Sequence, residues 1–202
     1  MKFGRGRLKI NLILSKIKFF TLQFFRQKSL CIKNNSVILG KNIQIKQPKL
    51  LVLGEKVELK DNVRISGNVS IGSHTVIYSY TKLNADKSII KIGDHCSFHD
   101  YSMIEATGDI IIGNNVRIAA HTIIVSGNHT FKPGLLIRRQ PVAGKNIVIE
   151  DDVWIGANVC ILAGVIIGNG SVIGAGSVVS RSIPAMSIAV GNPARVIKRR
   201  DS

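Results

Sequence analysis

The chain has 202 residues, of which 45% are hydrophobic and 20% charged, and its formal net charge is +16. This length and apolar content favour one folded domain with an appendage over two independent domains. The positive charge does not indicate a nucleic-acid-binding protein, because nine Lys or Arg and no acidic residue lie in residues 1–33 and further cations gather near the end of the chain.

Residues 1–33 are predicted to form a basic amphipathic segment. Their cations surround an apolar series at helical spacing, namely Ile13, Ile17, Phe20 and Phe24. The apolar runs are much shorter than the ~20 residues of a membrane span, and Lys16 and Lys18 interrupt the apolar region that a signal peptide needs. Two interpretations remain open: the helix lies on an anionic membrane surface, or it packs against the base of the fold or a neighbouring subunit.

A six-residue repeat begins near Ser36 and continues to about residue 188. Aliphatic residues recur six apart at Ile149, Ile155, Ile161, Ile167, Ile173 and Val179, with smaller or branched residues four places later. Neither an α-helix nor a simple strand has this period, so the pattern predicts a stack of parallel β-coils, with three hexads in each triangular coil. Short insertions at 84–88 and 106–109 shift the register and are predicted to be corner loops.

One long insertion, residues 126–146, interrupts the repeat. It is polar, basic and rich in turn residues, and Asn128 and His129 lie near its start. A loop of this length in a uniform stack is uncommon unless it is functional. After Pro184 the repeat ends, and residues 189–202 are predicted to leave the stack as a C-terminal tail.

Three motifs occur in a fixed order. Gly127-Asn128-His129 opens the long loop, Asp152-Val153-Trp154-Ile155-Gly156-Ala157 opens the next coil, and Ala189-Val190-Gly191-Asn192-Pro193-Ala194-Arg195 precedes the basic end. With the hexads, they make residues 36–198 resemble the hexapeptide-repeat acyltransferases, within them the maltose, galactoside and polysaccharide O-acetyltransferase group. The resemblance implies an all-β fold, a left-handed parallel β-helix, assembled as a homotrimer with each active site between two subunits.

The same resemblance implies acetyl-CoA as co-substrate, no metal, and roles for individual residues. His129 matches the catalytic base. Trp154 and Ala157, with Asp152 beside them, match the thioester end of the coenzyme cleft, where the main chain near Ala157 offers an N–H to the oxyanion. The positions that contact acetyl-CoA in the family correspond here to Ala175, Ser180, Arg181, Arg195 and Lys198.

Transfer of an acetyl group to a sugar hydroxyl needs a base, and histidine, with a free pKa of about 6.5, suits this role near neutrality. The acceptor-binding residues are predicted to be Asn128, His99, Tyr101 and Glu105. Small-sugar members carry an Asn below the histidine where this chain has His99-Asp100-Tyr101, so the acceptor stays open. Glu105 should lie under Val125, one coil below the loop, where it orients His129, binds the acceptor, or is a solvated corner carboxylate.

Rival interpretations attach to other residues. The histidines His74, His95, His99 and His121 suggest an alternative, a zinc enzyme of the carbonic anhydrase type. Two observations argue against it: the start of the long loop separates His121 from His129, and a carbonic anhydrase would have no use for the three motifs. Cys160 could act as a covalent acyl carrier, but no histidine lies near it in the register of the repeat, which argues against this role. The chain has three cysteines without metal-type spacing, and this favours a reducing compartment. A non-catalytic scaffold is the remaining alternative.

The sequence therefore predicts an acetyl-CoA-dependent O-acetyltransferase acting on a sugar in capsule, O-antigen or exopolysaccharide synthesis. It is expected in the cytoplasm, with peripheral contact at the inner face of the cell membrane through residues 1–33, and without nucleic acid as a partner.

Overall fold

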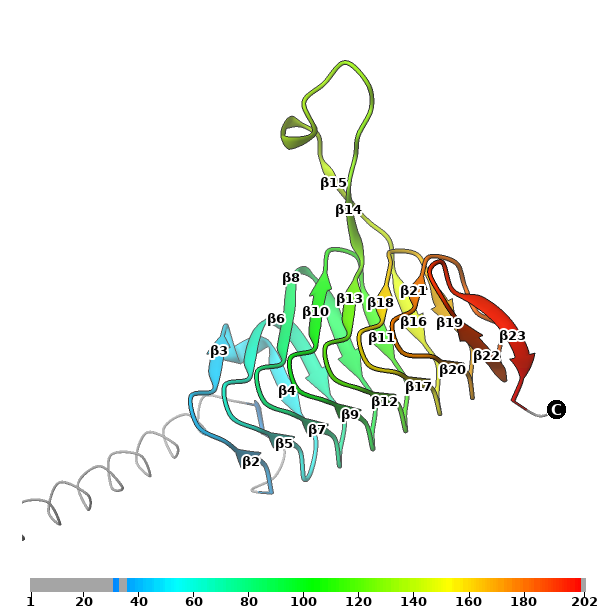
Figure 1. Cartoon of the computed structure of the whole chain (residues 1–202). Coiled ribbons are helices and arrows are strands. Elements are labelled where there is room, and N and C mark those ends of the chain that lie inside the picture. The colour runs from blue at the N-terminus through cyan, green and yellow to red at the C-terminus, as the bar shows by residue number, and fades with distance from the viewer. Residues whose placement is uncertain (1–30, 33–35, 201–202) are drawn as a thin grey trace, which may run out of the picture.

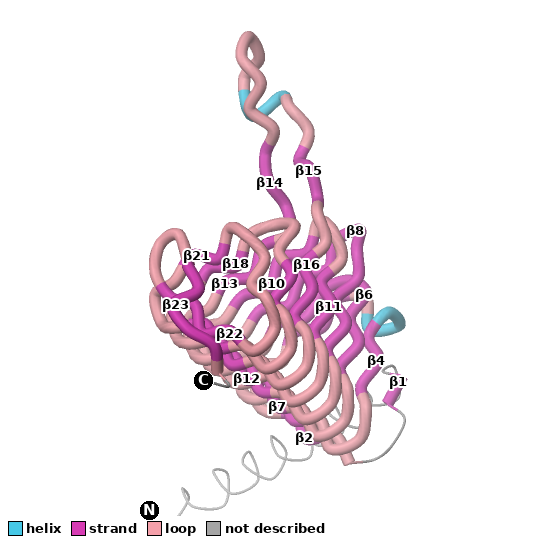
Figure 2. Tube along the Cα trace, turned by 90° about the vertical axis from the view of Figure 1, so that its right-hand side faces the viewer, coloured by secondary structure: helices cyan, strands magenta, loops and turns pink. Residues whose placement is uncertain are grey.

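The computed structural model describes residues 31–32 and 36–200 (Figure 1). The basic helix expected before them lies outside these residues. Within them the chain winds into the left-handed parallel β-helix that the resemblance implies, with three faces meeting at three corners (Figure 2). None of the helices in this described part is long and apolar enough to cross a membrane.

The first face is a nine-stranded sheet. Its strands, in spatial order, are β2 (Ile38–Leu39), β5 (Glu58–Leu59), β7 (Val76–Ile77), β9 (Ser97–Phe98), β12 (Arg117–Ile118), β17 (Trp154–Ile155), β20 (Val172–Ile173), β22 (Ser187–Val190) and β23 (Arg195–Arg199). All neighbours pair in parallel except β22 and β23, which are antiparallel.

The second and third faces belong to one twelve-stranded sheet, because β6 (Arg64–Ile71) and β8 (Lys82–Ile92) run across the corner between them. The second face also contains β3 (Gln44–Lys46), β10 (Met103–Ala106), β13 (Ile123–Val125), β18 (Cys160–Ile161) and β21 (Val178–Val179). The third contains β1 (Cys31–Ile32), β4 (Leu51–Leu53), β11 (Ile110–Ile112), β16 (Ile147–Ile149) and β19 (Ile166–Ile167). Short 3-10 turns are η1 (Pro48–Leu50) and η2 (Ile137–Arg139).

The repeat residues fill the interior, as predicted. The hexad aliphatics from Leu53 to Ile183 point inward and are buried, and so are the smaller residues four places later, such as Val153 and Val159. Cys96, at one of these small positions, is buried too. Stacked coils thus remove one continuous apolar column from water, which is the main source of stability in such a repeat.

Each coil turns through a first corner after the first face, a second corner after the second face and a third corner after the third face. At the first corner the third turn residue has a positive φ in every coil, for example Asn62 at 61° and Asn158 at 58°. Asn tolerates this conformation better than most residues. At the third corner, side chains of the next coil cap the turn: Asp94 Oδ1 accepts the Ser73 N–H at 2.6 Å and Asn114 Oδ1 accepts the Asp94 N–H at 2.8 Å.

Three boundaries differ from those expected. Strand β1 lies inside residues 1–33 and pairs with β4, so the sheet begins before the expected start of the coils. Residues 84–88 form no loop, because β8 passes the second corner as a strand with a register shift opposite Gly67 and Asn68. Residues 195–199 of the expected tail fold back as β23, whose pairing covers the edge that β22 would otherwise expose.

Candidate active site

The long insertion forms a β-hairpin that projects far from the stack in both views (Figure 1, Figure 2). It leaves the second corner after β13, and its stem pairs β14 (Gly127–His129) with β15 (Val142–Gly144) in antiparallel fashion, His129 opposite Val142. Asn128 and His129 are both exposed. His129 lines a cavity of about 470 Å³ together with Asn128 and Ala143 of the two hairpin strands and with Phe131 and Lys145, which lie just beyond the ends of these strands.

Ser126 fixes the base of this hairpin. Its buried hydroxyl accepts the N–H groups of Thr107 and Gly108 at 2.9 and 3.0 Å and donates to the Gly108 carbonyl at 2.7 Å. Gly127 packs so closely on Thr107 that a Cβ there would overlap its hydroxyl. The glycine of the Gly-Asn-His motif is therefore required by close approach of two coils, and the approach sets the direction in which His129 leaves the stack.

Gln140 orders the hairpin tip. Its buried carboxamide accepts the Lys132 N–H at 2.8 Å and donates to the carbonyls of Lys132 and Leu135, each at 3.0 Å. The rest of residues 131–139 is exposed. One side chain thus closes the loop on itself where no core supports it.

Trp154 and Ala157 lie together at the first corner, not beside His129. Trp154 is on β17 between Arg117 and Val172 and is 57% exposed. Ala157 occupies the following turn, where its carbonyl accepts the Gly176 N–H at 2.8 Å. Among the hydrogen bonds of the described residues, the Ala157 N–H has no acceptor, so it is free to serve a ligand.

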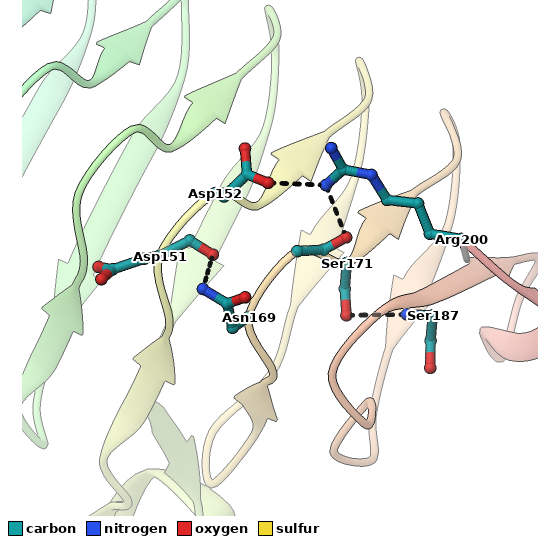
Figure 3. A network of polar contacts seen from close by, with 7 residues as sticks. Asp151, Asp152, Asn169, Ser171, Ser187 and Arg200 are labelled. Atoms are coloured by element: carbon teal, nitrogen blue, oxygen red, sulfur yellow. Dashed lines mark hydrogen bonds and ion pairs between the residues drawn. The ribbon is translucent and has the colours of Figure 1, made fainter.

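Asp152 lies at a different corner from Ala157. It occupies the third-corner turn before β17, and its carboxylate forms an ion pair with the Arg200 guanidinium at 2.9 Å (Figure 3). The same Arg200 nitrogen donates to the Gly170 carbonyl at 2.9 Å. Asp152 therefore anchors the end of β23, which crosses the first face, and does not lie beside the Ala157 turn.

The five residues matched to acetyl-CoA lie at two corners and on the last strand. Ala175 occupies the first-corner turn one coil beyond Ala157, close enough that a Cβ on Gly156 would meet its nitrogen at 2.6 Å. Ser180 and Arg181 follow β21 at the second corner, in the same column as the hairpin base, and both are exposed. Arg195 and Lys198 lie exposed on β23, at the C-terminal edge of the first face.

The predicted acceptor residues are divided in the same way. Glu105 pairs with Val125, which confirms the prediction of its position, but its carboxylate binds Lys82 at 2.5 Å and Asn84 at 2.8 Å. It thus extends a polar row along the second face. His99 and Tyr101 are at the first corner, where His99 stacks on Tyr78. Only Asn128 is adjacent to His129 in the hairpin.

Cys160 has surroundings that suit packing better than chemistry. It lies on β18 between Ile123 and Val178, and burial raises the pKa of its thiol. A raised thiol pKa lowers the thiolate fraction near neutrality. Across residues 31–32 and 36–200, three or more His, Cys, Asp or Glu side chains nowhere converge as metal ligands would.

Most of the predicted site residues form two groups at opposite ends of the second face; Asp152 at the third corner, Glu105 within the second face, and Arg195 and Lys198 on β23 lie outside them. The first-corner group contains Trp154, Ala157 and Ala175, with His99 and Tyr101 on earlier coils; the second-corner group contains the hairpin residues, Ser180 and Arg181. Strands β13, β18 and β21 separate the two groups within one chain.

Three residues that contribute to this arrangement were not found from sequence. Tyr80 continues the column of Tyr101, and the signal was available, since each is the third residue after an inward hexad residue, Ile77 and Phe98 respectively. Ser126 was visible only as the start of the loop. Gln140 had no signal, because its role depends on how the hairpin tip folds.

Comparisons with known proteins identify the family. A family model described as bacterial transferase hexapeptide (six repeats) matches residues 146–181. The Escherichia coli (strain K12) protein WbbJ, whose name assigns it to lipopolysaccharide biosynthesis as an O-acetyl transferase, is 33% identical over 146 residues, covering 68% of this chain and 74% of WbbJ. The chain belongs to the bacterial hexapeptide transferases. It is accordingly an acyltransferase of this family.

Two further members are similar over most of their length. The dTDP-4-amino-4,6-dideoxy-D-glucose acyltransferase of Escherichia coli is 30% identical over 166 residues, covering 78% of this chain and 86% of that protein. The crystal structure of AntD, an N-acyltransferase from Bacillus cereus in complex with dTDP and 3-hydroxybutyryl-CoA, aligns with a TM-score of 0.61 and 25% identity over 88% of this chain and 87% of AntD.

Proposed function

We propose that this hexapeptide transferase moves an acetyl group from acetyl-CoA to a sugar hydroxyl during synthesis of a surface polysaccharide, namely capsule, O-antigen or exopolysaccharide. The observation that carries the proposal is the exposed His129, held by a rigid hairpin base against a cavity of about 470 Å³ in a chain of acyltransferase family. The relatives named for sugar and lipopolysaccharide acylation, and the acyl-CoA bound by AntD, support the substrate classes.

The reaction needs no covalent enzyme intermediate. The His129 imidazole takes the proton of the acceptor hydroxyl as its oxygen attacks the thioester carbonyl. A backbone N–H at the first corner, that of Ala157, stabilises the oxyanion of the tetrahedral intermediate. Collapse of the intermediate breaks the C–S bond, and the imidazolium returns its proton to the departing CoA thiolate.

A homotrimer with sites between copies completes this reaction scheme. His129 and Ala157 belong to different corners of one chain, with the strands of the second face between them. Closed cyclic assembly lets each copy present both corners, one to each neighbour, so every interface acquires a complete set of groups. Ser180 and Arg181 then lie beside the hairpin of one copy, while Ala175, Arg195 and Lys198 supply the other wall of the acetyl-CoA site.

The cationic groups suit the charge of the coenzyme. Arg181, Arg195 and Lys198 are exposed, and Arg and Lys are the usual partners of phosphate. Trp154, the single tryptophan of the chain, presents an exposed indole near the Ala157 turn, where it contacts the pantetheine arm or the acyl group. For the basic segment 1–33 we propose contact with an anionic membrane surface or with a neighbouring subunit, the two interpretations that its sequence leaves open.

Release of free CoA from acetyl-CoA tests the proposal. Wild type is assayed against a panel of monosaccharides, nucleotide sugars, amino sugars and glycans, beside His129→Asn and the matched control His74→Asn, an exposed histidine at the third corner. We expect His129→Asn to lower kcat at least about 100-fold and the control to leave it unchanged. Equal turnover by the two variants would exclude His129 as the base.

A further inference from the structure

Three exposed rings form a column at the first corner. Tyr80 and Tyr101 stack with ring centroids 4.8 Å apart and planes 3° from parallel, and Tyr101 stacks on His121 at 5.1 Å and 4°. Tyr80 and Tyr101 are about half exposed, at 51% and 52%. We name Tyr80, Tyr101 and His121 the first-corner ladder.

The backbone does not call for aromatic side chains at these positions. Tyr80, Tyr101 and His121 have φ values of 62°, 61° and 60°, a region in which histidine is comparatively common but a bulky tyrosine is rare. The coils before and after the ladder use asparagine at the same turn position, at Asn62 and Asn158. Conformationally disfavoured residues that persist while a favoured type serves neighbouring coils point to a role in binding.

A cavity of about 320 Å³ adjoins the early end of the ladder. Tyr80, Tyr101 and Asn62 line it on the corner side, and Arg64 and Lys82 line it on the second face. Among the ring contacts of the described residues, Tyr80 has one partner, Tyr101, so its other face is left without an aromatic neighbour beside the cavity. The site therefore combines an aromatic surface, an amide and two cations.

The charge of the cavity is positive. The Arg64 side chain is exposed, and none of the hydrogen bonds or ion pairs of the described residues involves its guanidinium. Lys82 shares its charge with Glu105, and a second cavity of about 230 Å³ on the far side of Arg64 and Lys82 adds Lys46. Of the acids at this corner, Asp61 accepts the Lys41 N–H at 2.7 Å, and neither Asp61 nor Asp100 lines the cavity.

The ladder leads from this cavity toward the proposed transfer point. The column of third turn residues runs through Asn62, the ladder and Asn158, and Asn158 directly follows Ala157. Backbone hydrogen bonds between successive turns confirm the stacking, with Tyr101 N–H bound to the Ser79 carbonyl at 3.1 Å and Asn158 N–H bound to the Ala120 carbonyl at 3.0 Å. A chain-like ligand lying along the ladder would have one end at Arg64 and the other at Ala157.

We propose that the first-corner ladder and the Arg64 cavity form an extended acceptor track for an anionic glycan chain. The guanidinium of Arg64 pairs with a carboxylate or phosphate of one sugar unit, for which its planar fork is suited. Ring C–H groups of the sugars contact the exposed edges of the ladder rings, and the Asn62 side chain bonds their hydroxyls. This inference rests on the proposed function, since it names the class of acceptor that the same site takes.

Binding of oligosaccharides to the full-length protein tests the track. Calorimetry compares a galacturonic acid tetramer, its neutral galactose counterpart and a glycerol phosphate oligomer, so that carboxylate, charge-free and phosphate ligands are separated. Arg64→Gln removes the charge, and Tyr80→Asn installs the residue that the neighbouring coil already uses at this φ, so the fold is retained. Lys91→Gln, an exposed cation on the third face, is the matched control.

We expect wild type to bind at least one anionic oligomer more tightly than the neutral one. Arg64→Gln should weaken that binding about tenfold and Tyr80→Asn about fivefold, with Lys91→Gln unchanged. Equal affinity for all three oligomers, or equal loss in Arg64→Gln and Lys91→Gln, would overturn the proposal.

The two proposals fail separately. If CoA release with a monosaccharide acceptor depends on His129 while anionic oligomers do not bind at Arg64, only the track is wrong. If oligomers bind at Arg64 but His129→Asn turns over as fast as wild type, the proposed catalysis is wrong and the track stands as a glycan-binding surface.

Discussion

Replacing Ala157 with proline removes one backbone N–H from the first corner and keeps the carbonyl. The turn accommodates the change, because Asn158 at the next position has φ 58°, and turns with a positive φ at their third residue favour proline at their second. The bonds that hold the turn also remain, since the Gly156 N–H still reaches the Ile173 carbonyl and the Ala157 carbonyl still accepts from Gly176.

The substitution should therefore affect kcat strongly and the stability of the fold only slightly. The Ala157 N–H has no acceptor among the described residues, so the free energy of unfolding should change by less than about 1 kcal/mol. Loss of one oxyanion donor should lower kcat about 100- to 1,000-fold, with the KM for acetyl-CoA little changed.

The assay is steady-state CoA release together with thermal unfolding, and the chain offers a matched control. Ala120→Pro makes the same substitution at the same turn position one coil earlier, before His121 at φ 60°. Ala120→Pro should keep kcat within about threefold of wild type. An equal loss of kcat in both variants, or full activity in Ala157→Pro, would refute the assignment of Ala157 as an oxyanion donor.

Further predictions concern stability and the hairpin. Gly67 and Gly134 share φ 84°, but a Cβ at Gly67 would overlap the Ala85 carbonyl, whereas a Cβ at Gly134 would meet nothing. In urea unfolding, Gly67→Ala should therefore be less stable than Gly134→Ala by at least about 2 kcal/mol. Equal stability of the two variants would contradict this packing. Gln140→Ala should speed tryptic cleavage of the hairpin tip while the Tm stays within a few degrees, and an unchanged cleavage rate would mean that the carboxamide does not order the tip. Burial raises the pKa of Cys96 above its ordinary value of 9.0, so the thiol stabilises the fold below that pH and the benefit is lost as pH rises beyond it. Wild type should therefore lose more stability than Cys96→Ala between neutral and alkaline pH, and parallel losses would contradict this.

The repeat made the interior predictable. A strict six-residue period places each inward side chain, so burial of the hexad aliphatics and of Cys96 could be stated in advance. Counting one coil back from Val125 also located Glu105 correctly. These inferences succeed because each coil contacts only its neighbours, and local spacing therefore determines three-dimensional position.

The ends of the stack and the partners of its side chains were less predictable. The return of Arg195–Arg199 as β23 satisfies a sheet edge, which no hexad signals. Glu105 binds Lys82 and Asn84 because the second faces of successive coils lie side by side. Which neighbouring side chain Glu105 contacts depends on the reach of the side chains. The separation of Asp152 and Ala157 was overlooked although the register contains it, since Asp152 is the third residue after inward Ile149 and Ala157 the second after inward Ile155, in turns on either side of β17.

The division of the site between two corners is the main consequence of the structure for function. Each coil contains three turns, so motifs in neighbouring coils can lie at different corners. This is the case for Asn128-His129 and Trp154-Ile155-Gly156-Ala157. The proposal that the reaction uses both therefore makes assembly a condition for activity.

Subunit complementation tests this claim most directly. His129→Asn and Ala157→Pro, each nearly inactive alone, are unfolded together in equal amounts and refolded. If every site takes His129 from one copy and Ala157 from the next, each mixed trimer contains one intact site, and the mixture should recover about a quarter of wild-type kcat. No recovery above the separately refolded variants would contradict a site shared between copies.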